Sequence, residues 1–204
     1  MSARTELEHA YFRLAHSHMD ADALARPSCR ARLVERLLTA TPRDGIVLEL
    51  GCGNGAPVAA AIAAEGRHVV GVDTVFRRLQ QARVAVPSGS FLCATFLELA
   101  MRPATVDGVV AFHGLIHAPQ ARFADLLTRV GSWIRPGGLI VFSVGAATSL
   151  WPSEYAPPGV VCIDPSATDQ IVRAAGLVLA DRQVTEYADG AGHVAFQWVT
   201  AVRR

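Results

Sequence analysis

The stretch that decides the fold is Ile46-Val-Leu-Glu-Leu-Gly-Cys-Gly-Asn-Gly55. Its first five residues form an almost continuous apolar run, which is typical of a strand buried on both faces of a parallel sheet. The glycines that follow let the backbone turn sharply and let a ligand lie against main chain that carries no side chain. The stretch therefore predicts a buried strand, a turn with exposed backbone and then a helix.

An acidic residue follows this turn at an informative spacing. Asp73 comes 22 residues after Gly51 and directly after His68–Val72, which is predicted to be the next strand. A carboxylate at that strand end lies beside the turn and accepts hydrogen bonds from both hydroxyls of a ribose. Asp73 alone would serve equally well as the N-cap of the helix predicted over Phe76–Val86. The glycine turn and the acid together favour nucleoside binding.

The rest of the chain alternates strands and helices, which indicates a parallel sheet with helices on both faces. The predicted strands are Ile46–Leu50, His68–Val72, Ser90–Ala94, Val106–Phe112 and Leu139–Val144. The predicted helices are Arg30–Thr39, Pro57–Glu65, Phe76–Val86, Arg122–Ile134 and Ser166–Ala175.

The end of the chain departs from this alternation. Two β-rich runs, Leu177–Tyr187 and His193–Val202, are separated by only five residues, 188–192. A parallel crossover needs about a dozen residues or more, so the two runs are expected to form an antiparallel hairpin. The predicted fold is a doubly wound, mostly parallel α/β sheet with one reversed strand.

Composition narrows the organisation and the function. A chain of 204 residues suits one domain, expected as a core over 28–204 with a helical cap over 1–27. No apolar stretch approaches the ~20 residues of a membrane span, and no secretory signal is visible, so a cytoplasmic location is expected. The four cysteines are scattered, which indicates reduced thiols.

The charged residues argue against further classes of function. A net charge of +1 gives no basic patch for nucleic acid. All 19 basic residues are arginines, so the lysine that kinases and pyridoxal enzymes require is missing.

Four stretches together resemble the class I S-adenosylmethionine-dependent methyltransferases. They are Val47–Gly55, Val70–Asp73, Phe112–His117 and Arg135–Gly138, and the resemblance runs from about Ile46 to Arg204. The helix, R-P-G-G and apolar strand around the last stretch are typical of members that act on small molecules. The resemblance implies a seven-stranded sheet whose last strand is reversed, which agrees with the hairpin inferred from the loop length.

The resemblance implies S-adenosylmethionine as cofactor and assigns residues to it. Glu49 is expected to hold the methionine amino group, Asp73 the ribose, and Thr95 and Phe96 the adenine. The full set of expected cofactor contacts is Tyr11, Glu49, Gly51, Cys52, Gly53, Asp73, Thr74, Thr95, Phe96 and His113.

The methyl acceptor is expected beyond the carboxyl ends of the strands, where open α/β sheets bind ligands. His113 and His117 follow a strand there, and their i, i+4 spacing predicts one side of a helical turn. Either imidazole is a candidate general base or a hydrogen-bonding group. Trp151, Tyr155 and His193 are candidate acceptor contacts, with packing roles as the alternative. Two histidines do not complete a metal site, so no metal is expected.

The expected activity is methyl transfer to an O, N or C atom of a small metabolite, by a monomer or homodimer. A methyltransferase-like protein that binds the same cofactor without methylating is a first alternative. A nicotinamide-dependent oxidoreductase is a second, disfavoured by the G-x-G-x-G spacing and by the terminal hairpin.

Overall fold

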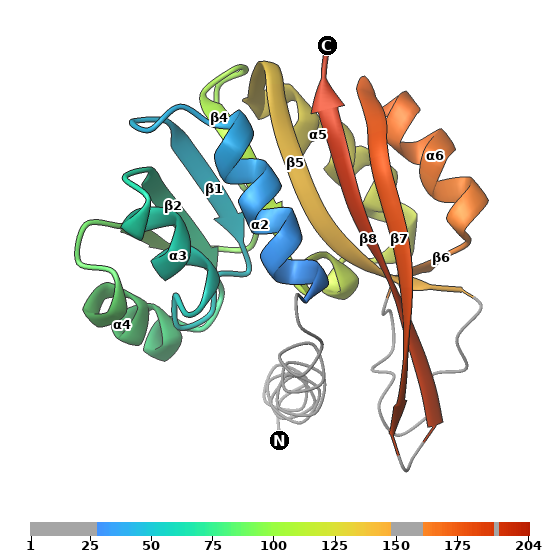
Figure 1. Ribbon diagram of the computed structural model, residues 1–204, viewed down its shortest axis with the longest axis horizontal. Helices are drawn as coiled ribbons and strands as arrows, with labels where there is room; N and C mark the ends of the chain where they lie inside the picture. Colours follow the sequence, from blue (N-terminus) through green and yellow to red (C-terminus); the bar gives the residue numbers. More distant parts are fainter. Residues whose placement is uncertain (1–27, 148–160, 190–191) are drawn as a thin grey trace.

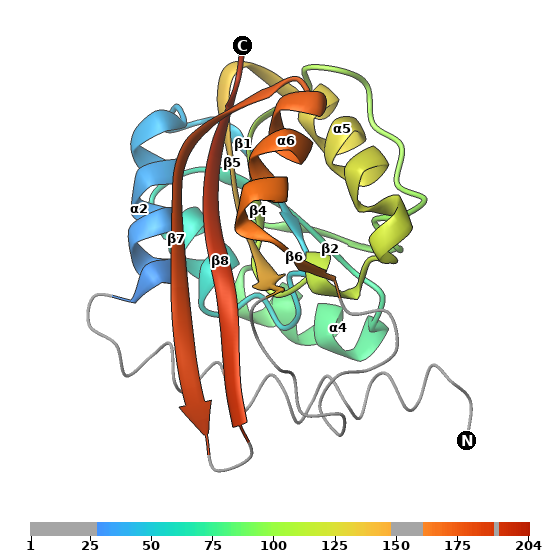
Figure 2. The ribbon, with the colours of Figure 1, turned by 90° about the vertical axis from the view of Figure 1, so that its right-hand side faces the viewer.

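The described part of the chain forms one twisted sheet with helices on both faces (Figures 1 and 2). The computed structural model describes residues 28–147, 161–189 and 192–204, without the side chains of 187–194. The strand order is β3-β2-β1-β4-β5-β8-β7, with a short β6 paired to β5. The strands are β1 (Ile46–Leu50), β2 (His68–Asp73), β3 (Ser90–Cys93), β4 (Val106–Ala111), β5 (Ile134–Ala146), β6 (Cys162–Ile163), β7 (Leu177–Asp189) and β8 (Gly192–Arg203). The predicted doubly wound α/β fold is confirmed.

Strand direction confirms the predicted hairpin. Strands β1 to β5 run parallel, whereas β8 runs antiparallel to both β5 and β7. The last backbone pair of the hairpin joins Asp189 to Gly192. In Figure 1 the hairpin extends past the edge at which β1 and β5 end. The two-residue β6 was not predicted, because so short a strand has no periodicity to recognise.

Two of the described helices, α2 (Cys29–Ala40) and α6 (Pro165–Ala174), begin at a polar residue whose side chain caps them. The others are α3 (Val58–Ala64), α4 (Phe76–Ala85) and α5 (Phe123–Trp133), with 3₁₀ turns η1 (Leu115–His117) and η2 (Gln120–Arg122). Ser28 caps α2 by accepting from the Ala31 N–H at 3.1 Å, and Asp164 caps α6 through the Ser166 N–H at 2.8 Å. Pro165 takes the first helical position, where its missing N–H removes no hydrogen bond.

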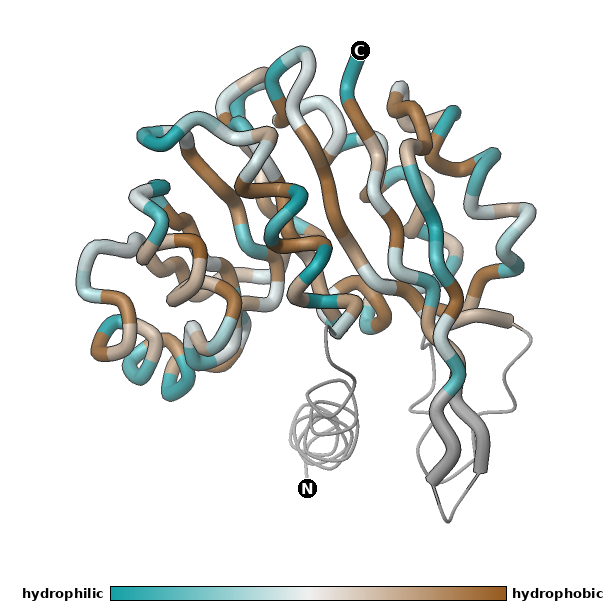
Figure 3. The backbone as a smooth tube through the Cα atoms, viewed as in Figure 1, coloured by the Kyte–Doolittle hydropathy of each residue, from teal (hydrophilic) through white to brown (hydrophobic). Residues whose placement is uncertain are grey.

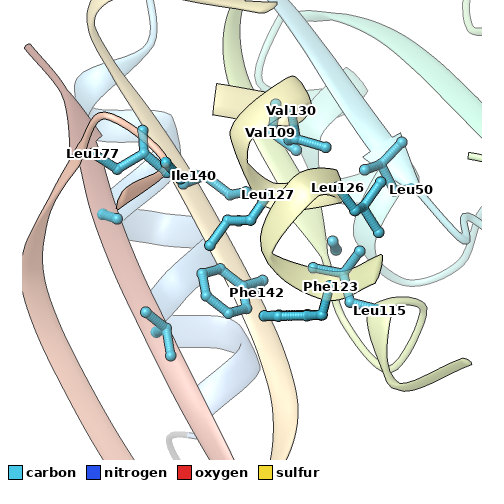
Figure 4. Packing of buried hydrophobic residues seen from close by; sticks show 14 of the residues in the cluster. Leu50, Val109, Leu115, Phe123, Leu126, Leu127, Val130, Ile140, Phe142 and Leu177 are labelled. Atoms are coloured by element: carbon cyan, nitrogen blue, oxygen red, sulfur yellow. The ribbon is translucent and has the colours of Figure 1, made fainter. Parts of the chain in front are cut away.

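The sheet separates two apolar cores. On one face, Phe123, Leu126 and Leu127 of α5 pack toward Phe142 and Ile140 of β5 (Figure 4). On the other face, α2 covers the sheet, and its residues belong to a second cluster with strands β1, β4, β5 and β8. Figure 3 shows the apolar central strands between more polar helices. These two layers fix the carboxyl ends of the parallel strands relative to one another.

Strand β5 starts earlier than predicted, at Ile134 rather than Leu139. The R-P-G-G stretch is included because Val106 pairs with Ile134, and the register then shifts before Gly108 pairs with Leu139. A Cβ on Gly138 would lie 2.5 Å from the Asp107 carbonyl oxygen, so glycine permits this close approach. The stretch predicted as a connection is therefore an irregular first part of the strand.

A buried carboxylate joins three segments at the amino-terminal edge of the sheet. Asp107 is 9% exposed, accepts from the Ile46 N–H at 2.8 Å and pairs with the Arg135 guanidinium at 2.5 Å. Because Arg135 is about half exposed, the bond to the backbone N–H carries more of the stabilisation than the ion pair.

Replacing Asp107 by alanine is expected to destabilise the fold by about 1–3 kcal/mol, since the Ile46 N–H loses its acceptor. Urea unfolding measures this change. Asp44→Ala, at an exposed position of the turn before β1, is the control and is expected to change stability by less than about 0.5 kcal/mol. Equal effects of the two substitutions would contradict the assigned role.

Candidate cofactor site

The turn after β1 presents bare main chain at the carboxyl edge of the sheet. Gly51 and Cys52 donate their N–H groups to the Val72 carbonyl at 2.8 and 3.1 Å, which fixes the turn to the end of β2. Gly51, Gly53 and Gly55 all have positive φ, at 81°, 56° and 80°. A Cβ built on Gly53 would meet nothing within 4 Å, so open space lies above this residue. The predicted exposed backbone is present.

Two of the glycines allow close packing behind the turn. A Cβ on Gly51 would lie 3.1 Å from the Gly114 Cα, and a Cβ on Gly114 would lie 2.6 Å from the Leu50 carbonyl oxygen. A Cβ on Gly55 would lie 3.1 Å from the Ala82 side chain of α4. The three glycines therefore have two roles: Gly51 and Gly55 permit contact with neighbouring segments, and Gly53 leaves room for a ligand.

Asp73 lies beside the turn, as the spacing predicts. Its Oδ2 accepts from the Gly53 N–H at 2.9 Å, and its Oδ1 accepts from the Val75 N–H at 2.9 Å. Helix α4 begins after Val75 with no side-chain cap, so Asp73 is not its N-cap. The side chain is only 9% exposed. Asp73 is thus held with its carboxylate against the open loop.

Glu49 is a second carboxylate at this edge, and it is 7% exposed. Its Oε2 is buried and has no hydrogen-bond partner among the described residues. Burial raises the pKa of Glu49 well above its ordinary value, the Asp73 carboxylate raises it further, and Arg30 of α2 opposes this. A buried acceptor without a donor fits the ammonium group of a bound amino acid, which is the role the resemblance implies.

Cys52 lies between the two acids in sequence and is 5% exposed. Burial, Glu49 and Asp73 all raise the pKa of its thiol, so the group stays neutral. A neutral, buried thiol is not a nucleophile. Cys52 therefore contributes its backbone to the turn rather than reactive chemistry.

The two histidines after β4 do not share a helical turn, so that prediction is wrong. His113 has a left-handed φ of 55° and precedes the 3₁₀ turn, so the i, i+4 geometry of a helix does not apply. Its ring meets Phe196 and Trp198 of β8 edge-on, with centroids 4.9 and 5.4 Å apart. His117 instead lies within electrostatic reach of Asp73 and Arg78, and mainly burial lowers its pKa to about 4. His117 is therefore neutral at physiological pH.

The expected adenine contacts surround the end of β3. Thr74 is exposed, and its carbonyl lies 3.6 Å from the Cys93 thiol. Thr95 accepts from the Leu97 N–H at 3.2 Å, and Phe96 packs against the core cluster on the α5 face. Their contact with adenine stays a prediction.

Several expected site residues cannot be placed. Tyr11, Trp151 and Tyr155 lie outside the described residues, as does the side chain of His193, whose backbone belongs to β8. Among the residues that are described, no group of three His, Cys, Asp or Glu side chains is arranged to hold a metal ion. Sequence reasoning missed Arg30 and Gly114, since both reach the site only through tertiary contacts.

A hollow of about 600 Å³ lies elsewhere, between α2 and α3. Its lining includes Arg30, Val34, Leu38, Val58 and Ala61, but none of Gly53, Asp73 and His117. The hollow therefore belongs to the outer helical layer and is not lined by the glycine turn or by the two carboxylates, although Arg30 both lines it and acts on Glu49.

Fold and site together define a class: a doubly wound sheet with a reversed strand, a glycine turn and an acid at the end of β2 form the architecture of class I S-adenosylmethionine-dependent methyltransferases. The family model described as a methyltransferase domain matches residues 17–187. The chain belongs to this methyltransferase domain family.

Relatives by sequence match only part of the chain. A probable S-adenosylmethionine-dependent methyltransferase of Mycobacterium tuberculosis is 35% identical over 118 residues, which are 57% of this chain and 41% of that protein. The 24-methylenesterol C-methyltransferase 2 of Oryza sativa subsp. japonica is 31% identical over 127 residues, covering 59% of this chain and 34% of the relative. The chain spans less than half the length of these curated relatives.

Among solved structures, the Burkholderia thailandensis 1,6-didemethyltoxoflavin-N1-methyltransferase, with bound 1,6-didemethyltoxoflavin and S-adenosylhomocysteine, superimposes with a TM-score of 0.67. It is 20% identical, and the match covers all of this chain and 91% of that one. The predicted family and fold are confirmed.

Gly53→Ala is expected to abolish detectable cofactor binding, because the new methyl group enters the open space above the turn. Gly137→Ala is a matched control: Gly137 also has positive φ and no neighbour within 4 Å of a Cβ, but it precedes the regular part of β5 at the opposite edge. Both substitutions should destabilise the fold by about 1 kcal/mol through backbone strain. Calorimetric titration that finds full affinity in Gly53→Ala would contradict the assignment of the open space.

The buried, neutral ring of His117 leads to a prediction of how the stability of the fold depends on pH. Its pKa falls from 6.5 to about 4 on folding, so the unfolded chain binds more protons between these values. The neutral imidazole therefore makes its full contribution to the free energy of unfolding above pH 6.5, and this contribution is lost as the pH falls toward 4. Urea unfolding should show that acidification from pH 7 to pH 4.5 destabilises wild type by about 2 kcal/mol more than His117→Asn. Parallel losses in both proteins would contradict the burial of a neutral ring.

Proposed function

We propose that the chain binds S-adenosylmethionine over the turn after β1 and transfers its methyl group to an O, N or C atom of a small molecule. The observation that carries the proposal is the pairing of the open space above Gly53 with two buried carboxylates. One of them, Asp73, is bonded to the turn itself, and the other, Glu49, keeps a buried oxygen without a donor. A ligand that carries both a ribose and an amino-acid ammonium would give each of the two carboxylates a hydrogen-bond donor.

The residues present fit the cofactor at three points. Gly53 leaves main chain open to the adenosyl and methionine parts, Asp73 offers carboxylate oxygens to the ribose hydroxyls, and Glu49 offers Oε2 to the ammonium. We further propose that the adenine is contacted by Thr74, Thr95 and Phe96. When bound, the sulfonium supplies a methyl group already activated by its positive charge.

Alignment is the main task left to the protein. In-line displacement needs the acceptor atom behind the methyl carbon, and orientation of this kind supplies an effective molarity of ~10⁵ M or more. His117 is neutral, so its imidazole is able to accept a hydrogen bond from an acceptor hydroxyl or amine. We assign His113 to positioning near the acceptor, because two rings of β8 hold its own ring in place.

A small acceptor is the part of the proposal that the comparisons support by name. One relative is named for a sterol and one structural neighbour for 1,6-didemethyltoxoflavin. No helix in the described part of the chain is long and apolar enough to cross a bilayer. A cytoplasmic location and a monomeric or dimeric state stay predictions.

The test is isothermal titration of the dialysed protein with S-adenosylmethionine and with S-adenosylhomocysteine. Binding of both, followed by a mass increase of one methyl group in an acceptor, is the expected outcome. Binding with a product of unchanged mass would favour a methyltransferase-like protein that does not methylate. Failure to bind either compound, or binding of NADH instead, would overturn the proposal.

Asp73→Asn is expected to weaken S-adenosylhomocysteine binding by about 10- to 100-fold, since one carboxylate oxygen is replaced by an amide that donates. Asp181→Asn is the control, because Asp181 lies on β7 and pairs with Arg36 of α2. Thermal unfolding of both variants tests whether they are folded. An unchanged affinity in Asp73→Asn would mean that the carboxylate does not hold the ribose.

A further inference from the structure

Glu49 and Asp73 form a pair of carboxylates with very little solvent. Glu49 of β1 is paired in register with Gly71 of β2, and Asp73 follows two residues later on the same strand, so both acidic side chains lie on one face of the sheet at its carboxyl edge. Both side chains are less than a tenth exposed. Each carboxylate raises the energy of an ionised neighbour, and burial removes the water that would screen them.

The two acids differ in how their oxygens are satisfied. Asp73 accepts from the Gly53 and Val75 N–H groups, one on each oxygen, and these bonds favour its ionised form. Glu49 has a buried Oε2 with no donor among the described residues. When no ligand is bound, Glu49 is therefore the member of the pair that holds a proton.

The other charged or titratable groups that act on Glu49 or on Asp73 do not replace that proton. On α2, the Arg30 guanidinium opposes protonation, but desolvation and Asp73 outweigh it. In the turn, the Cys52 thiol stays neutral. On η1, burial keeps His117 uncharged above its pKa of about 4, although Asp73 favours its charged form. Within the described part of the chain Arg30 is the positive charge that acts on Glu49, and a cationic ligand would add a second one.

We infer that this site exchanges a proton for a cationic amine. The ammonium group of the bound cofactor takes the place of the proton on Glu49, and that proton is released to solvent. The inference rests on the proposed function and goes beyond it, because it concerns how binding is coupled to pH. In the step the Glu49 O–H bond breaks, its proton passes to a water molecule of the solvent, and the carboxylate stays behind to accept a hydrogen bond from the ammonium. Each ammonium bound therefore releases up to one proton, according to the fraction of Glu49 that is protonated before binding.

Two consequences follow from this exchange. Affinity for a ligand that carries the ammonium increases with pH, up to the pKa of Glu49 in the free protein. Affinity for a neutral ligand that occupies only the nucleoside part, such as 5′-methylthioadenosine, does not increase in this way. S-adenosylhomocysteine has the ammonium but no sulfonium, so it assigns the effect to the amine.

The experiment is titration calorimetry of full-length protein at pH 6.5 in three buffers that differ in ionisation enthalpy. The dependence of the observed heat on that enthalpy gives the number of protons released. We expect release of up to one proton with S-adenosylmethionine and S-adenosylhomocysteine, and none with 5′-methylthioadenosine. Glu49→Gln should bind S-adenosylhomocysteine at least tenfold more weakly without proton release, whereas Glu65→Gln, exposed at the end of α3, should behave as wild type.

A second measurement does not need the ligand. Because folding raises the pKa of Glu49 above 4.5, the folded protein binds more protons than the unfolded chain above that pH. Stability contributed by the protonated acid is therefore lost as the pH rises through the folded pKa. Ligand-free Glu49→Gln should unfold at a higher temperature than wild type at pH 8, with a smaller difference at pH 5.

The outcomes separate the two proposals. Binding of S-adenosylhomocysteine with no proton release would overturn the exchange and leave the methyltransferase proposal standing. Release of the same number of protons by Glu49→Gln would also overturn it, since another group would then be the source. Failure of all three nucleosides to bind would overturn both proposals.

Discussion

The site depends on one interaction, the hydrogen bond from the Gly53 N–H to Asp73 Oδ2. It joins the turn after β1 to the end of β2, and the bonds from Gly51 and Cys52 to the Val72 carbonyl hold the same junction. Because parallel strands end at one edge, this junction places exposed main chain and a carboxylate side by side. The glycines follow from that constraint, since the backbone adopts positive φ on both sides of the bond.

The surrounding packing keeps this edge rigid. Gly114 lies against Leu50 and Gly51 so closely that a Cβ would meet the Leu50 carbonyl oxygen at 2.6 Å. His113, one residue earlier, adopts a left-handed φ and fixes its backbone N–H on Ser143 of β5 at 2.8 Å. Strain of about 1–3 kcal/mol at such a residue persists only when packing requires it. Here the aromatic rings of β8 and the buried Ser143 are the contacts that hold His113 in this conformation.

The sequence predicts those parts of the structure that short-range patterns determine. The buried strand, the glycine turn and Asp73 were predictable, because each is encoded by neighbouring residues and by strand-to-strand spacing. The hairpin was predictable because five connecting residues exclude a parallel crossover. The separate surroundings of His113 and His117 were not, because the φ of His113 is imposed by contacts distant in sequence. The effect of Arg30 on Glu49 and the approach of Gly114 to the turn depend on tertiary packing in the same way.

The account assigns the cofactor site to the junction of β1 and β2, and not to the hollow between α2 and α3. A crystal structure of the protein with S-adenosylhomocysteine tests this most directly. We predict ribose hydroxyls within hydrogen-bond distance of Asp73, the ammonium beside Glu49 Oε2, and the ligand in contact with Gly53. Density for the ligand between the two helices, or an Asp73 carboxylate turned away from the ribose, would contradict the account.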